Sequence, residues 1–187
     1  MKHRISFFLI FFIFINGYAQ NIPEVKLEGN KTLKLSELNV SVNITGNVAL
    51  TTYHMKFYNG TNSVLEGELA FPLGQGQSVT DFAMDVNGQL RHAVIVEKEL
   101  GRVAYENTIR QTIDPGLLEM TKGNNYKARV YPIPANGYKE LLITYEEILL
   151  ATDQKHKYTL PLQFTKSISN FSLDVSIHDK NNVRVIN

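Results

Sequence analysis

Apolar and polar side chains alternate along several short stretches of this sequence. In residues 38–44 and 171–177, every second side chain is aliphatic or aromatic and the side chains between them are polar. Residues 49–57 and 65–71 show a similar pattern, the second with Gly67 among the apolar positions. A period of two indicates half-buried β-strands, because successive side chains of a strand point to opposite faces. A polar second face favours antiparallel pairing, so the sequence predicts a mainly β protein with antiparallel sheets.

Asparagine–glycine pairs separate several of these runs. They occur at Asn59-Gly60, Asn87-Gly88 and Asn136-Gly137. Both residue types tolerate the positive φ that a tight hairpin turn requires. Asn87-Gly88 is the clearest hairpin signal, because strand-like runs lie on both sides of it.

One stretch breaks the alternation. Residues 97–112 (EKELGRVAYENTIRQT) are rich in helix-forming side chains, and Leu100, Val103 and Ala104 can line one side of a helix. The following Asp114-Pro115-Gly116 ends it, because proline cannot continue a helix. The expected fold is therefore an antiparallel β-sandwich with one inserted α-helix at about residues 97–112.

The N-terminus has the pattern of a secretory signal peptide. Lys2 and Arg4 precede an unbroken apolar run at residues 7–15. This run is much shorter than the roughly 20 apolar residues that span a bilayer. We therefore expect residues 1–19 to be a signal peptide, cleaved between Ala19 and Gln20. The product is an exported chain, periplasmic or secreted, without a stable membrane anchor.

Charge and cysteine content exclude several classes of function. Cleavage removes Lys2 and Arg4, which leaves 17 Lys and Arg against 18 Asp and Glu, a net charge of −1. A near-neutral chain without a basic block offers no electrostatic footprint for nucleic acid. The chain has no cysteine, which excludes disulfides, thiolate metal sites and a cysteine nucleophile.

An ordered set of short motifs runs through the middle of the chain. The motif residues are Phe71, Pro72 and Leu73; Glu97 and Lys98; Ala104, Tyr105 and Glu106; Asp114, Pro115, Leu117, Leu118 and Glu119; Pro132 and Pro134; and Tyr145. In this order and spacing they resemble the VIT domain, the vault protein inter-alpha-trypsin family. The resemblance covers roughly residues 30–164, and it is the ordered set that is specific.

The resemblance implies a fold and a domain organisation. It implies a β-sandwich with a helix, without an assigned catalytic activity, and it usually implies a von Willebrand A domain that follows. We expect residues 20–187 to form a single VIT-like domain. Because the sequence ends where the second domain would begin, a stand-alone module and the N-terminal part of a larger protein are both open.

None of the candidate ligand-binding patterns in the sequence matches a known motif fully. Asp174 and Ser176 have the spacing of part of a von Willebrand A metal motif, but such residues on alternate positions of a strand indicate a solvated face. The glycine-rich residues 74–78 precede a strand and lack a lysine, so they do not match a phosphate-binding loop. The histidines are isolated in sequence, so no zinc motif is formed. We expect no metal and no cofactor.

Two hypotheses of function remain. The favoured one is a non-enzymatic scaffold or protein-interaction module outside the cytoplasm, with exposed tyrosines and lysines in residues 126–145 contributing to a contact face. The alternative is an extracytoplasmic hydrolase whose carboxyl groups are brought together only by folding. Glycosylation sequons begin at Asn30, Asn43, Asn59 and Asn170.

Overall fold

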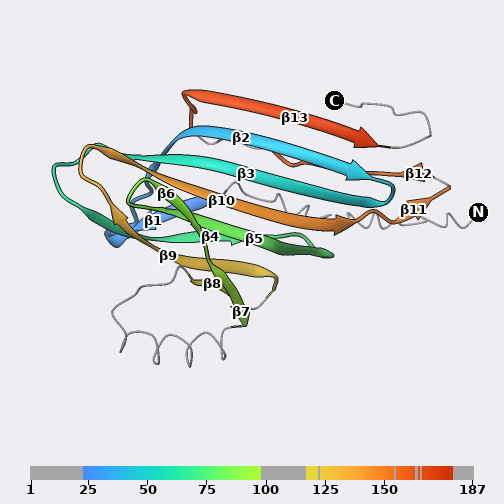
Figure 1. The fold of residues 1–187 in the computed structure, drawn as a ribbon, viewed down its shortest axis with the longest axis horizontal. Helices are drawn as coiled ribbons and strands as arrows, with labels where there is room; N and C mark the ends of the chain where they lie inside the picture. The colour runs from blue at the N-terminus through green and yellow to red at the C-terminus, as the bar shows by residue number, and fades with distance from the viewer. Residues whose placement is uncertain are drawn as a thin grey trace, which may run out of the picture.

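The alternating runs form the strands of two facing β-sheets (Figure 1). The computed structural model describes residues 23–97, 117–121, 123–153, 155–162, 164 and 166–178. No helix in this part of the chain is long and apolar enough to cross a membrane.

The larger sheet has six strands. Their order across the sheet is β13 (Asn170–His178), β2 (Lys34–Thr45), β3 (Val48–Asn59), β10 (Gly137–Ile148), β5 (Gln77–Val86) and β6 (Gln89–His92). Two long antiparallel ladders join its three central strands, and β3 and β10 pair over their full length of twelve residues. Figure 1 shows β13, in red, at the margin of this sheet beside β2.

The smaller main sheet has five strands. Their order is β1 (Glu24–Leu27), β4 (Leu65–Pro72), β9 (Asn125–Ile133), β8 (Leu117–Thr121) and β7 (Val94–Glu97). A short 3-10 turn, η1 (Glu28–Asn30), follows β1, and β11 (Ala151–Thr152) and β12 (Lys155–His156) form a separate hairpin.

The apolar positions of the alternation pack between the two sheets. Met55 and Phe57 of β3 and Leu141 and Ile143 of β10 are at most 1% exposed. Phe71 of β4 belongs to the same core cluster from the other sheet. The sequence prediction of half-buried strands is therefore confirmed for the central strands. Burial of the inner face fixes the register of each strand, because a slip of one residue would turn its apolar side chains to solvent.

The mainly β class is confirmed, and the strand directions are mixed. Most pairs are antiparallel, but β13 runs parallel to β2 and β7 runs parallel to β8. Alternation reports which face of a strand is covered and carries little information on direction, so the sequence did not predict these two pairs. Beyond Glu97, which ends β7, residues 98–112 of the expected helix lie outside the described residues.

The Asn87-Gly88 turn joins β5 to β6 as a hairpin, as expected. Both residues have positive φ, 56° and 80°, and the flanking Val86 and Gln89 are paired. The apolar run after it is not one strand. It divides at Ala93 into β6, in the six-stranded sheet, and β7, in the five-stranded sheet.

Gly67 lets β1 lie close against β4. A Cβ atom at this position would lie 2.7 Å from Val25 Cγ1 and 2.9 Å from the Lys26 carbonyl oxygen. We predict that Gly67→Ala lowers the free energy of unfolding by about 1–3 kcal/mol, because the backbone of β1 must move. Urea denaturation measures the change.

Gly60→Ala is the matched control, since its Cβ would meet a movable Tyr58 ring carbon at 3.3 Å. Equal losses of stability in the two variants would contradict the close approach of β1 as the reason for glycine at position 67.

Candidate interaction surface

Half of the VIT-like motif residues whose burial the structure describes lie in the interior of the sandwich. Phe71, Leu73, Leu118 and Tyr145 are buried, and they come from strands or strand ends of both sheets. The remaining described motif residues lie at strand ends, on an outer face or in a connection; these are Pro72, Glu119, Pro132 and Pro134. The motif residues that the structure describes are thus scattered over both sheets.

The remaining motif residues and the two residues of the expected cleavage position give less structural information. Glu97 and Leu117 are described only as members of β7 and β8. The rest lie outside the described residues; these are Ala19, Gln20, Lys98, Ala104, Tyr105, Glu106, Asp114 and Pro115.

A group of tyrosines lies on the inner face of the six-stranded sheet. The Tyr53 and Tyr145 rings stack with centroids 6.1 Å apart, and the Tyr158 hydroxyl lies 2.7 Å from Thr51 Oγ1. Burial raises the pKa of Tyr53, Tyr145 and Tyr158, so all three phenols remain neutral. Nearby hydroxyl groups offset part of this effect on the pKa of Tyr145. A neutral, enclosed phenol suits packing better than proton transfer.

Tyr158 holds the β12–β13 connection, residues 157–169, against the core. Its hydrogen bond to Thr51 ties this connection to β3, and Leu160, Leu162 and Ile168 pack against the core beside it. The tyrosine group therefore fixes the segment that leads into β13.

Lys139 is buried between the sheets, although the sequence placed it on an exposed face. Its side chain is 1% exposed, and Nζ donates to the carbonyl oxygens of Asp85 at 2.5 Å and Tyr131 at 3.4 Å. Tyr131 belongs to β9 and Asp85 to β5, so the ammonium group joins the two sheets. Hydrogen bonds are what make a buried ammonium group tolerable.

The expected contact face in residues 126–145 is thus only partly present. Tyr126, Lys139 and Tyr145 are buried, whereas Tyr131 and Tyr138 are exposed. The burial of a charged residue on the inner face of a strand can be predicted only when its buried partners are known, and the sequence does not show them.

The glycine-rich residues 74–78 are satisfied by their own surroundings. The Gly74 amide donates to Gln77 Oε1 at 2.9 Å, and Asn124 Nδ2 donates to the carbonyl oxygens of Gly74 and Gln77. Gln77 Nε2 donates in turn to Glu147 Oε2 at 2.9 Å. The loop leads into β5, as the sequence indicated, and its polar groups hold the β8–β9 turn.

Asn59 has a structural role that its sequon does not reveal. Its side chain is 1% exposed, its Nδ2 donates to the carbonyl oxygens of Ser63 and Pro134, and its Oδ1 accepts from Thr61. The Asn59 side-chain amide therefore forms hydrogen bonds through both its nitrogen and its oxygen, and it joins the loop after β3 to the end of β9. Asn43 and Asn170 are exposed instead.

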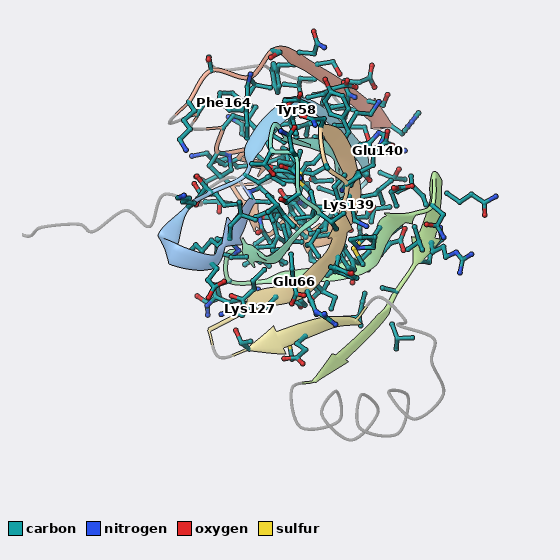
Figure 2. All side chains as sticks on the ribbon, turned by 90° about the vertical axis from the view of Figure 1, so that its left-hand side faces the viewer. Tyr58, Glu66, Lys127, Lys139, Glu140 and Phe164 are labelled. Atoms are coloured by element: carbon teal, nitrogen blue, oxygen red, sulfur yellow. The ribbon has the colours of Figure 1, made fainter. Side chains whose placement is uncertain are left out.

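The outer face of the five-stranded sheet carries alternating charges. Arg129 donates two 2.8 Å hydrogen bonds to Glu66, and Lys127 Nζ lies 2.7 Å from Glu68 (Figure 2). The Arg129 guanidinium holds the pKa of Glu66 below its usual range and also lies 5.3 Å from the Tyr131 ring centroid. Exposed pairs of both signs make a solvated face and contribute little to stability.

The outer face of the six-stranded sheet carries a polar network and one aromatic pair. Glu140 accepts from Lys56 and lies 3.2 Å from His54 Nε2, and hydrogen bonding to Glu140 raises the pKa of Lys56. The Tyr58 and Tyr138 rings lie 5.0 Å apart at one end of this face. Tyr58 and Glu140 are labelled in Figure 2.

The described carboxyl groups give the hydrolase hypothesis no support. Glu66, Glu68 and Glu140 engage basic side chains, and the direction of the pKa shift of Glu66 is opposite to that of a general acid. Among the described residues, no three His, Asp or Glu side chains are grouped so as to hold a metal ion.

An apolar strip follows the inner face of β13. The strip consists of Phe164, Phe171, Leu173 and Val175, which are 42–49% exposed, and the rings of Phe164 and Phe171 meet edge to face at 5.3 Å. The sequence predicted the alternation of β13 but not the exposure of its apolar side.

The register shows why the apolar strip is uncovered. Leu173 pairs with Val40, and Val175 pairs with Val42, so these side chains share one face of the six-stranded sheet. Val40 and Val42 are at most 2% exposed. Within the part of the chain that the structure describes, the cover over the inner face therefore thins between β2 and β13, where Ile177 still packs against the core.

Comparison with known proteins identifies related sequences. The profile of the vault protein inter-alpha-trypsin domain matches residues 35–145. Inter-alpha-trypsin inhibitor heavy chain H3 of Rattus norvegicus is 21% identical over 168 residues, and the Bos taurus protein is 22% identical over the same length. The alignments cover 89% of this chain but 19% and 18% of those relatives, so the chain spans about a fifth of their length.

One of the solved structures that match has low similarity to this chain. It is the collagen binding subdomain of the Enterococcus faecalis surface protein ACE, 12% identical, with a TM-score of 0.35. The match covers 62% of this chain and 74% of that one. A score this low supports no structural or functional inference.

The tyrosine group generates a stability prediction. The Tyr145 hydroxyl is buried without a well-aligned hydrogen bond to any described residue. We expect Tyr145→Phe to unfold at the same urea concentration as the wild type or at a higher one, because no hydrogen bond is lost.

Tyr158→Phe is the matched variant, and it removes the hydrogen bond to Thr51. It should lower the free energy of unfolding by about 1 kcal/mol. A larger loss of unfolding free energy in Tyr145→Phe than in Tyr158→Phe would contradict this prediction, because it would show that the Tyr145 hydroxyl makes the stronger hydrogen bond.

Proposed function

Because the chain belongs to the vault protein inter-alpha-trypsin (VIT) domain family, we propose that it is a non-enzymatic protein-interaction module. The relatives are named as heavy chains of the inter-alpha-trypsin inhibitor. Because the identity is low and the chain covers about a fifth of those relatives, the activity of the whole relatives is not transferred to this chain. The residues of this chain support binding more than chemistry.

The apolar strip is the observation that carries this proposal. Soluble proteins cover most of their large apolar side chains, and a contiguous exposed group of them marks a contact site. Phe171, Leu173 and Val175 of β13 form such a group together with Phe164 of the preceding connection. The outer faces of both sheets carry ion pairs, and the outer face of the six-stranded sheet also carries exposed apolar side chains such as Leu50 and Tyr138.

We further propose that the module acts outside the cytoplasm. The support is the pattern of residues 1–19, with a basic start, an apolar run and a cleavage position between Ala19 and Gln20. In this proposal residues 20–187 are one VIT-like domain, either alone or at the N-terminus of a larger protein with a von Willebrand A domain.

Site-specific photocrosslinking in the source organism tests the proposal. A photoreactive amino acid replaces Leu173 in the apolar strip, and in a control chain it replaces Lys127 on the outer face of the other sheet. We expect a discrete crosslinked protein from position 173 and none from position 127, since the apolar strip is the contact face. No crosslink at position 173, or the same products from both positions, would contradict the proposal.

A further inference from the structure

The free edge of β13 is exceptional among the edges of the two main sheets. β6 and β7 have four residues each. The outer side of β1 is covered by the chain itself, because Leu27 N donates to the Lys31 carbonyl oxygen and Leu33 N donates to the Val25 carbonyl oxygen. β13 is nine residues long, so among the described edge strands it alone presents a long row of backbone groups.

The sequence of β13 lacks the devices by which proteins protect such edges. Charged residues, proline, short length and bulges normally discourage a further strand from pairing. β13 reads NFSLDVSIH, without lysine or proline, and its ladder with β2 has no register shift. Asp174 is the single acidic residue, and it lies on the polar face.

The two faces of β13 specify the chemistry of an added strand. On one face Phe171, Leu173 and Val175 require apolar side chains at alternate positions of the occupant. On the other face Ser172 and Ser176 flank Asp174, so a basic side chain opposite Asp174 gives charge complementarity. The occupant is therefore an extended segment that alternates apolar with polar residues and carries a central Lys or Arg.

A second copy of this chain fits the edge less well. Asp174 is the middle residue of the nine, so an antiparallel self-pairing over the full strand places it opposite its own copy. Like charges directly opposite each other destabilise a strand pair. Charge complementarity favours a strand from another protein.

We propose that the partner binds by adding such a strand to the free edge of β13. The added strand continues the six-stranded sheet, and its apolar side chains cover the apolar strip. Backbone hydrogen bonds supply the binding, and the side chains on alternate positions supply the selectivity. This inference rests on the proposed interaction function and specifies its mode.

Two synthetic peptides of nine residues test the mode on the purified chain. Both are acetylated and alternate valine with threonine, and they differ at the central polar position, which is lysine in one and glutamate in the other. Fluorescence anisotropy measures the Kd of each. The wild-type chain should prefer the lysine peptide by about threefold, and Asp174→Lys should reverse the preference.

A pair of leucine variants separates strand addition from general stickiness. Leu173→Lys places a charge within the apolar strip and should weaken binding of the lysine peptide by roughly tenfold. Leu50→Lys is the matched control, because Leu50 is similarly exposed but lies on β3, which is paired on both sides. It should bind like the wild type. Circular dichroism verifies that both variants fold.

Several outcomes would overturn the strand-addition mode. These are no peptide binding, an unchanged preference in Asp174→Lys, and equal binding by the two leucine variants. A stable dimer that Leu173→Lys dissociates would identify a second copy as the occupant. If the crosslinked partner still binds Leu173→Lys, this mode is wrong but the interaction function stands. If peptides bind as expected but position 173 yields no partner, the proposed function fails instead.

Discussion

Packing of the inner faces of β3 and β10 against β4 is the interaction on which the rest of the structure depends. These two strands pair over twelve residues, and their inward side chains meet Phe71 across the core, with Tyr53 edge to face against its ring. A slip of one residue would expose Phe57 and bury Lys56, so the register is strongly determined. The outer faces and the position of each neighbouring strand follow from this register.

The polar groups inside the sandwich are consistent with this packing. Lys139 reaches carbonyl oxygens of β5 and β9, and Asn59 joins two loops at the same end of β10. Thr51 and Tyr158 hold the β12–β13 connection on the core. Each of them ties a segment to the central ladder.

Much of the fold could be predicted from the sequence, and the exceptions have physical reasons. Alternation located the central strands, and Asn87-Gly88 located a hairpin, because both signals are local. The burial of Lys139 and Asn59 depends on partners about 50 to 75 residues away in sequence, which no local pattern shows. Alternation also located β13 but could not show that its apolar face lies beyond the reach of the opposite sheet.

The unequal cover of the six-stranded sheet links this packing to the proposed function. The cover thins between β2 and β13, so among the described strands β13 combines a half-exposed apolar face with a position at the edge of its sheet. The proposed contact site therefore follows from the position of β13 at the edge of the six-stranded sheet, where the opposite sheet covers less of the inner face.

Hydrogen exchange of the isolated chain, resolved to single amides, tests most directly whether β13 pairs with β2 on one side and is free on the other. In β3, which has neighbours on both sides, nearly all amides should exchange slowly. In β13, about every second amide should exchange slowly through its bond to β2, and the others should exchange quickly. Slow exchange at every β13 amide would show that the edge is already covered, and fast exchange throughout would show that β13 does not pair with β2. Either result would contradict the account.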